Sequence, residues 1–353
     1  MVVYVAGAAI VPGGDPAEAS LEELVFEAAA AALTDAGTTR AEIDGVCLAA
    51  SDQLDGRVIS SMHMAGPAGG YLRDEVKVAD DGSSAFAAAV LRLEAGASRR
   101  VLAVAWGKRE KVTPAEAEAP NPSPLYEREL GLHPLVAEAL VAQLFAHRHG
   151  IPLDRFDELA ARLHGDRAGK AAGSGDDDGD GMISSPLRYR HLAPEADAAV
   201  ALVLSSEPAA VEVAGLAWGA ESADPLARGA PPEETLASLA RRAYQQAGVD
   251  GTAASVVETT ERNVFRLCIS AAGLGLVAPG RAPDALLGLL GGGLPALNRA
   301  GGLFAGEAMF AAGLERIAHA ARAVAAGAGL AVAHSAYGRA GQGQLVTVLR
   351  RAT

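Results

Sequence analysis

Residues 83–107 read SSAFAAAVLRLEAGASRRVLAVAWG: a small-residue turn, an alanine-rich helix pattern, a glycine stop and an apolar strand pattern that ends in glycine. The same order of patterns returns at residues 309–338, which read MFAAGLERIAHAARAVAAGAGLAVAHSAYG. A helix pattern followed by an apolar strand is the unit from which sheets with helical layers are built. The match indicates that the chain repeats one α/β unit.

Two further pairs of segments support a duplication. VYVAGAA (3–9) corresponds to VEVAGLAWG (211–219), and a helix pattern ending in Ala-Gly follows each of them. LEELVFEAAAAALTDAG (21–37) leads to the strand pattern DGVCLAAS, just as LASLARRAYQQAG (236–248) leads to SVVETT. Three pairs in the same order predict two similar α/β halves about a pseudo-twofold axis, each with a mostly parallel sheet.

The two halves differ by an insertion. We assign residues 1–210 to an N-terminal half and residues 211–353 to a C-terminal half. The first half contains an inserted loop domain, about 108–185, which we expect to cover that half. Helices over 83–95 and 307–326 should pack together at the centre, because small residues at a helix contact permit a short interaxial distance. The last strand pattern, QLVTVLRR, follows a glycine-rich turn and should pair back as a hairpin.

The composition limits the classes of function. Half of the 353 residues are hydrophobic, and 43 acidic residues against 30 lysines and arginines give a net charge of −13. An acidic surface repels phosphate backbones, so we expect no nucleic-acid binding. No stretch reaches the ~18–20 apolar residues of a membrane span. Two cysteines, Cys47 and Cys268, are too few for a disulfide framework; we expect them on buried faces of a cytoplasmic protein.

Local motifs mark two candidate sites. In VADDGSSAFAAAV (78–90), Ser83 or Ser84 can cap the following helix, and the first-turn amides form a natural oxyanion site. In GGLFAGEAMFAAG (301–313), Glu307 is expected in the first turn of a helix, where a carboxylate meets the helix dipole. Helix capping alone would explain both motifs without any function.

Two other motifs do not indicate a cofactor or a metal. HSAYGRAGQGQ (334–344) has glycines spaced as in a dinucleotide site, but a strand pattern follows them where a helix is needed. DDDGDGMISSPL (176–187) has Leu187 where a calcium loop needs a bidentate Glu, so a solvated acidic loop is expected there. The histidines and cysteines show no metal-ligand spacing. We therefore expect no metal and no bound cofactor.

Taken together, these segments resemble the thiolase superfamily, in its sterol-carrier-protein-x or lipid-transfer-protein branch. The resemblance runs nearly end to end and is strongest in LYERELGLHPLVAEALVAQ (125–143); LNRAGGL (297–303) and the DGSS turn also match. It implies a thiolase-like α/β fold, in which two duplicated halves form a five-layer αβαβα arrangement. It also implies acyl-CoA substrates and a dimer.

The chain departs from that family at its catalytic positions. The nucleophilic cysteine at the helix start falls on Gly82 or Ser83, and the His-Asp motif aligns with Thr260 and Glu261. A serine without a histidine base is a poor acyl acceptor. Neither Cys47 nor Cys268 stands at a motif position.

The other two motifs are also altered. The Gly-His-Pro histidine aligns with Glu307, or with Ala308 on a shifted register. The second cysteine aligns with Ser335 or Tyr337. Ordinary thiolysis of a CoA thioester is therefore not expected.

Three functions remain open. The first is a cysteine-free lyase or aldolase that acts on a β-hydroxyacyl-CoA beside a small OB-fold and zinc-ribbon partner, as some members of the branch do. The second is a non-catalytic subunit paired with an active thiolase homologue, and the third is an acyltransferase that uses Ser83 or Ser84. In either of the first two, the edge strand EVKVAD (75–80) is expected at a homodimer or heterodimer interface.

For the lyase, proton transfer is assigned to Glu307 and Tyr337, with Ser83 beside them. Backbone amides near Ser83 and Ser84 would hold the oxyanion. The remaining candidates for binding the substrate are Gly82, Ser84, Thr260, Glu261, His334, Ser335 and Gly338.

Overall fold

The computed structural model describes residues 1–13, 19–109, 112–165, 181–228, 231–293 and 295–352. Within that part of the chain, the first half contains β1 (Tyr4–Pro12), α1 (Leu21–Asp35), β2 (Gly45–Ala49), α2 (Ser61–Met64), β3 (Asp74–Val78), α3 (Gly82–Glu94), β4 (Arg100–Gly107) and β7 (Ala198–Ser205). The second half contains β8 (Val211–Ala220), α7 (Pro232–Ala247), β9 (Val256–Thr259), α8 (Val264–Gly273), α9 (Ala282–Leu290), β10 (Ala296–Leu297), α10 (Ala312–Ala325), β11 (Leu330–Tyr337) and β12 (Gly343–Arg351).

The strand order repeats the duplication. The described strands of the two halves form one sheet in the order β10-β9-β11-β12-β8-β1-β7-β4-β2-β3, joined at its middle where Tyr4 and Val5 pair with β8. Counted from that junction, the two halves run through equivalent strands: β1 with β8, β7 with β12, β4 with β11, β2 with β9 and β3 with β10. The sheet is mixed, because β7 and β12 run antiparallel to their neighbours. The expected β11–β12 hairpin is confirmed.

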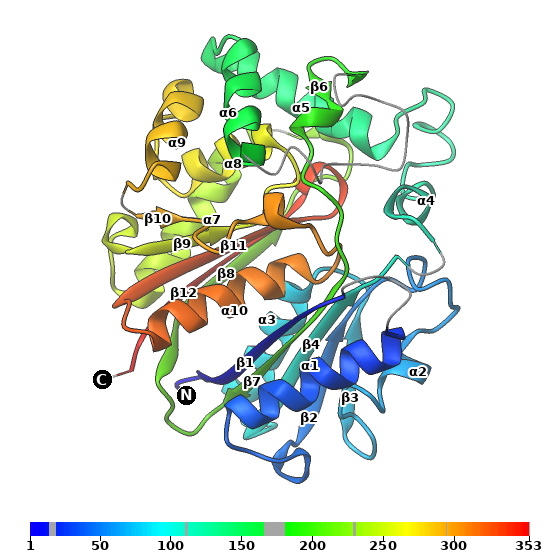
Figure 1. Cartoon of the computed structure of the whole chain (residues 1–353), viewed down its shortest axis with the longest axis vertical. Coiled ribbons are helices and arrows are strands. Elements are labelled where there is room, and N and C mark those ends of the chain that lie inside the picture. Colours follow the sequence, from blue (N-terminus) through cyan, green and yellow to red (C-terminus); the bar gives the residue numbers. More distant parts are fainter. Residues whose placement is uncertain (14–18, 110–111, 166–180, 229–230, 294, 353) are drawn as a thin grey trace.

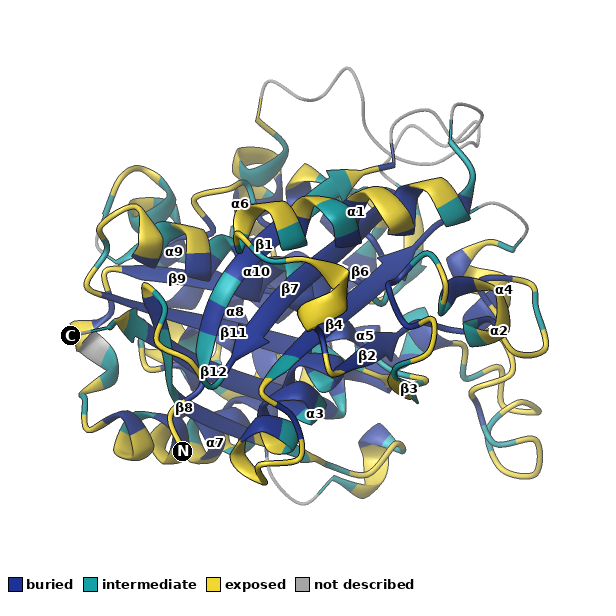
Figure 2. Cartoon of the chain, turned by 90° about the horizontal axis from the view of Figure 1, so that it is seen from below, coloured by how far each residue is buried: buried dark blue, intermediate teal, exposed yellow. Residues whose placement is uncertain are grey.

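The helices form three layers around the two halves of the sheet. The central helices α3 and α10 contact each other, and α10 also contacts β1 and β7 of the other half (Figure 1). On the outside, α1 covers the first half of the sheet, and α7 and α8 cover the second. Figure 2 shows the strands buried between half-exposed helices. This is the expected five-layer, thiolase-like arrangement of two duplicated halves.

One glycine in each half explains why the Ala-Gly pattern repeats. A Cβ at Gly7 of β1 would lie 2.6 Å from the carbonyl oxygen of Ala32 in α1. A Cβ at Gly215 of β8 would lie 2.2 Å from the carbonyl oxygen of Ala243 in α7. Only glycine lets the outer helix approach its strand this closely.

The second central helix starts later than expected. It begins at Ala312, whereas Glu307 lies in the preceding loop. The chain does not turn into the helix earlier because Gly306 and Phe310 both have positive φ, 146° and 69°. Glu307 is therefore not a first-turn carboxylate, and the predicted helix-dipole contact is wrong.

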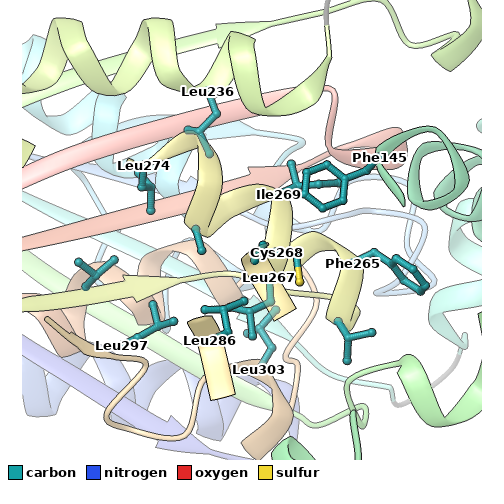
Figure 3. Packing of buried hydrophobic residues seen from close by; sticks show 14 of the residues in the cluster. Phe145, Leu236, Phe265, Leu267, Cys268, Ile269, Leu274, Leu286, Leu297 and Leu303 are labelled. Atoms are coloured by element: carbon teal, nitrogen blue, oxygen red, sulfur yellow. The ribbon is translucent and has the colours of Figure 1, made fainter. Parts of the chain in front are cut away.

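The inserted segment contains α4 (Pro114–Glu118), α5 (Pro134–His149), α6 (Asp154–His164), β5 (Met182–Ser184) and β6 (Leu187–Arg188). It covers the second half of the molecule, not the first. Phe145 of α5 joins the same buried cluster as Phe265 and Leu267 of α8 (Figure 3). Phe156 of α6 belongs to this cluster as well. The rings of Phe156 and Phe265 stack with centroids 4.1 Å apart. The aspartates of the acidic loop 176–187, Asp176, Asp177, Asp178 and Asp180, lie outside the described residues.

Candidate active site

A cavity of about 270 Å³ lies where the two halves meet beneath the inserted segment. Residues that follow β3, β9 and β11 line it, together with residues of α4 and α5. Loops at the carboxyl ends of strands commonly carry binding sites in α/β folds. The ionisable residues that line the cavity are Asp80, Asp81, Glu118, Glu138, Arg262, Arg266, Glu307 and Tyr337.

Glu307 is held in the cavity by its own backbone. Its N–H donates to the carbonyl of Pro194 at 2.7 Å, and its carbonyl accepts from the N–H of Ala196 at 2.8 Å. Its side chain is only 14% exposed, and the nearest cation is Arg262, whose Nε lies 3.4 Å from Oε1. Burial raises the pKa of Glu307 from 4.5 to about 7, although the charge of Arg262 acts in the opposite direction. A carboxyl group with this pKa can both accept and donate a proton near neutral pH.

Arg262 joins Glu307 to the inserted segment. Its Nη1 donates to Oε1 of Glu118, at the end of α4, at 2.7 Å. Burial opposes the charge on this guanidinium, but Glu118 and Glu307 outweigh it and raise the pKa of Arg262. A second buried pair lies beside the first, with Nε of Arg266 donating to Oε2 of Glu138 in α5 at 2.8 Å. The sequence analysis found none of these four partners.

Tyr337, at the end of β11, faces the same cavity. Burial raises the pKa of Tyr337 to about 12, helped by the negative charges of Asp80 and Asp81, so its hydroxyl stays protonated. Burial also raises the pKa of Asp80 to about 6. Ser84 donates its hydroxyl to Oδ2 of Asp80 at 3.2 Å. The structure thus brings the two predicted proton-transfer residues, Glu307 and Tyr337, to one cavity.

Asp81 occupies the centre of the predicted nucleophile region. It is the N-cap of α3, and its Oδ1 accepts from the amide of Ser83 at 2.9 Å and from the Ser83 hydroxyl at 2.6 Å. The same carboxylate accepts from the Ser335 hydroxyl at 2.8 Å and from the amide of Gly313 at 3.0 Å. Asp81 therefore joins α3 to α10 and β11, and it replaces Ser83 or Ser84 as the cap predicted from the sequence. An aspartate directly before the glycine was the sequence signal that could have identified it.

The amides at the start of α3 cannot form the predicted oxyanion site. The amide of Gly82 donates to the carbonyl of Phe310 at 2.7 Å, and that of Ser84 donates to the carbonyl of Asp81 at 2.9 Å. The amide of Ser83 is already bonded to the Asp81 side chain. All three donors therefore have partners inside the protein.

Neither Gly82 nor Ser83, the two positions that the resemblance aligns with the nucleophilic cysteine, offers a nucleophile to the cavity. A Cβ at Gly82 would lie 2.6 Å from Cβ of Leu314 and 2.7 Å from Cβ of Ala105, so no side chain fits there. Ser83 is fully buried and does not line the cavity. Its hydroxyl donates to the carboxylate of Asp81, which is a weak base for a serine hydroxyl, and among the described residues no histidine has a hydrogen bond with Ser83.

Thr260 and Glu261 support the walls of the site. Thr260 lines the cavity, and its hydroxyl oxygen accepts from the amide of Ala336 at 2.7 Å, which fixes the end of β11. Glu261 is buried away from the cavity, where it accepts from the amide of Leu303 at 2.9 Å. Burial raises the pKa of Glu261 to about 8. Both residues position loops of the site.

His334 and Gly338 complete the predicted set. His334 is buried between the Thr259 hydroxyl, 2.6 Å from Nδ1, and the Gln344 side-chain oxygen, 2.7 Å from Nε2. Burial lowers the pKa of His334 to about 4, so the ring is neutral at pH 7, and it does not line the cavity. Gly338 lines the cavity with a φ of 68°.

Both cysteines are buried away from the cavity, as predicted. Burial raises the pKa of Cys47 to about 11 and that of Cys268 above its usual value. Figure 3 shows Cys268 packed among the apolar side chains of α8. Among the described residues, no three His, Cys, Asp or Glu side chains gather as metal ligands, and no helix has the length and apolarity to cross a membrane.

The fold is that of a thiolase-like protein. Solved structures with this architecture include an Ltp2–ChsH2(DUF35) aldolase, with a TM-score of 0.77 and 19% identity over 99% of this chain and 98% of the other. Human mitochondrial 3-ketoacyl-CoA thiolase has a TM-score of 0.70 and 15% identity over 100% of this chain and 99% of the other. No family model and no curated protein matches the sequence. At these identities the comparisons establish the fold.

Proposed function

We propose that this protein is an enzyme that cleaves or forms a carbon–carbon bond in an acyl-CoA without a cysteine nucleophile. The observation that carries the proposal is the Glu307 carboxyl group, which is held in the cavity with a pKa of about 7. The aldolase among the structural neighbours supports the same class of reaction. The cavity, at about 270 Å³, suits a short acyl group and the end of the pantetheine arm.

The cleavage of a β-hydroxyacyl-CoA needs one base and one acid. The Glu307 carboxylate accepts the proton of the C3 hydroxyl, the C2–C3 bond breaks, and its electron pair moves into the thioester as an enolate. Tyr337 donates its proton to C2, which gives a shortened acyl-CoA and an aldehyde or ketone. A proton then passes from Glu307 back to Tyr337 through solvent. The pKa of about 12 at Tyr337 keeps this donor protonated at neutral pH.

A non-catalytic subunit is the second candidate. The observation in its favour is that Asp81 and Phe310 occupy the amides that an oxyanion would need at α3. An acyltransferase that uses Ser83 has no such observation in its favour.

Pairing with a second chain is part of the proposal. Strand β3 lies at the edge of the sheet. Val76 within this strand and Leu72 in the segment before it are both exposed. An exposed edge with apolar side chains suits a second copy, a thiolase homologue or a zinc-ribbon protein. We expect a dimeric mass at micromolar concentration, and Val76→Lys should weaken it. A monomeric mass with and without the candidate partners would contradict this part of the proposal.

The test of the reaction is to incubate the protein with 3-hydroxyacyl-CoA thioesters and measure the shortened acyl-CoA and the carbonyl product by mass spectrometry. Glu307→Gln should lower the rate by about 10²–10⁴, because it keeps the shape of the side chain and removes its ionisable proton. Glu315→Gln is the matched control, since Glu315 is also 14% exposed and paired with an arginine but does not line the cavity. Full activity in both Glu307→Gln and Tyr337→Phe would remove the mechanism and leave the non-catalytic subunit.

A further inference from the structure

Arg262 lies between two carboxyl groups from different parts of the chain. Its Nη1 donates to Oε1 of Glu118, at the end of α4, at 2.7 Å, whereas its Nε lies 3.4 Å from Oε1 of Glu307. The second distance is longer than the ~2.7–3.2 Å of a typical N–H···O hydrogen bond. Both carboxyl side chains line the cavity, and they are 12% and 14% exposed. Two largely buried carboxyl groups thus share one cation, and Glu118 holds it more closely.

The charges of these three groups decide which form of Glu307 the site favours. With Glu307 protonated, the guanidinium of Arg262 and the carboxylate of Glu118 form a neutral pair. With Glu307 ionised, the three groups carry a net negative charge, which a site shielded from water disfavours. Burial is the main cause of the raised pKa of Glu307, and the charge of Glu118 adds to it. Without that charge, the guanidinium would have Glu307 as its counter-ion.

Two other carboxyl groups raise the pKa of Glu307 by their charge, but each has an arginine of its own. The two pairs are Glu138 with Arg266 and Glu195 with Arg109. Glu118 differs from both, because its arginine also contacts Glu307. The remaining ionisable groups that line the cavity are Asp80, Asp81 and Tyr337.

Glu118 also attaches α4 to the site. The first turn of α4 is closed by its own residues, since Thr113 and Glu116 form a capping box. Among the described residues, the side-chain hydrogen bond that joins α4 to the second half is the one from Arg262 to Glu118. The charge that surrounds Glu307 therefore depends on this part of the inserted segment being in place.

We propose that Glu118 is a positioning residue for the reaction: it holds the Arg262 guanidinium and shares its charge, so that the Glu307 carboxyl group remains able to exchange a proton. The inference rests on the proposed function for the role of Glu307. It goes beyond that function by assigning a residue of the inserted segment to the site. Glu118 acts through Arg262 and takes no proton itself.

The test follows the titration of Glu307 without any substrate. NMR of protein labelled at the side-chain carboxyl carbon of glutamate reports the ionisation of each carboxyl group, and Glu307→Gln identifies the signal of Glu307 by its loss. In the unaltered protein this signal should titrate at about pH 7. Glu118→Gln keeps the shape and a hydrogen-bond acceptor but removes the charge, so the signal should titrate about 1–3 pH units lower, the effect of an opposite charge at this range. Glu118→Ala should shift it in the same direction, so either folded variant decides the question.

Glu127→Gln is the matched control. Glu127 also belongs to the inserted segment, is also 12% exposed and pairs with Arg339 of the second half, but it does not line the cavity. Its replacement loosens the inserted segment to a similar degree without changing the charge on Arg262, so the Glu307 signal should not move. During cleavage of a 3-hydroxyacyl-CoA, the acidic limb of the pH–rate profile should move down in Glu118→Gln and stay in place in Glu127→Gln.

The outcomes separate the two proposals. A Glu307 signal that titrates alike in the unaltered protein and in folded Glu118→Gln, or that moves as far in Glu127→Gln, overturns the role of Glu118 and leaves the proposed function standing. The expected shift in a protein that turns over no thioester supports the coupling through Arg262 and overturns the proposed function. Titration of Glu307 near its ordinary value of 4.5 in the unaltered protein overturns both.

Discussion

Replacing Glu307 by Gln tests the electrostatics of the cavity independently of any activity. Burial raises the pKa of this carboxyl from 4.5 to about 7, so the fold prefers its protonated form. Stability that comes from this preference is complete below pH 4.5 and is lost as the pH rises through about 7. Gln cannot ionise, so the variant should not lose this stability at alkaline pH.

The size of the effect follows from the two pKa values. A change from 4.5 to about 7, at about 1.4 kcal/mol for each pH unit, corresponds to roughly 3 kcal/mol. The Glu307→Gln variant should therefore gain roughly 3 kcal/mol relative to the unaltered protein between about pH 4.5 and about pH 8.5. The difference in unfolding free energy between the two proteins is compared at both pH values. Any effect of the substitution on the contact with Arg262 that does not change with pH then cancels.

The assay is urea unfolding of both proteins at the two pH values. Glu315→Gln is a control of opposite sign. Although Glu315 is buried, its contacts with His319 and Arg316 hold its pKa below the usual value. Its ionised form therefore contributes stability above the unfolded pKa and loses it as the pH falls. Parallel pH dependence of the unaltered protein and Glu307→Gln would refute the assignment of a raised pKa to Glu307.

Three further predictions concern the nucleophile region. Iodoacetamide should label neither Cys47 nor Cys268 in the folded protein, because burial raises the pKa of both thiols. For the same reason, acetoacetyl-CoA thiolysis should stay at background. An iodoacetamide adduct on either cysteine of the native protein, detected by mass spectrometry, would contradict this prediction. Gly82→Cys should not create a thiolase and should cost about 1–3 kcal/mol in denaturant unfolding, because its Cβ would lie 2.6 Å from that of Leu314. Asp81→Ala should cost about 3 kcal/mol or more in the same measurement, since several buried donors lose their acceptor, and an unchanged unfolding midpoint would show that the contacts are not formed.

The sequence was sufficient to predict the duplicated fold because the repeated features are local. The Ala-Gly pattern at residues 3–9 and 211–219 marks the strands where Gly7 and Gly215 admit a closely packed helix. The pattern at 83–107 and 309–338 marks the central helices and the strands that follow them. Each pattern depends on contacts within one helix–strand unit, which neighbouring residues determine.

Strand β7 was missed for the opposite reason. It is buried along its whole length, and an apolar run without alternation or a flanking helix has little to distinguish it. The position of the inserted segment was missed as well. The sequence pattern does not say which half its apolar faces pack on; tertiary contacts such as that of Phe156 with Phe265 decide it.

The same limit explains the result for the candidate site. Glu307 and Tyr337 could be proposed because the resemblance aligns each, in one of two registers, with a motif position, and both line the cavity. Glu118 and Glu138 could not, because they come from the inserted segment, whose packing the sequence does not determine. Their partners, Arg262 and Arg266, lie in the loop after β9 and in the first turn of α8, and no sequence motif marked them.

The carboxylate of Asp81 disfavours an anionic intermediate at the start of α3. Asp81 places a negative charge at the start of α3, where the helix dipole favours an anion. It also accepts a hydrogen bond from Ser335 of the other half. Once this carboxylate is in place, an oxyanion at α3 would meet both a like charge and amides that are already bonded. Chemistry in this cavity must therefore use donors elsewhere, such as the hydroxyl of Tyr337, which lines it.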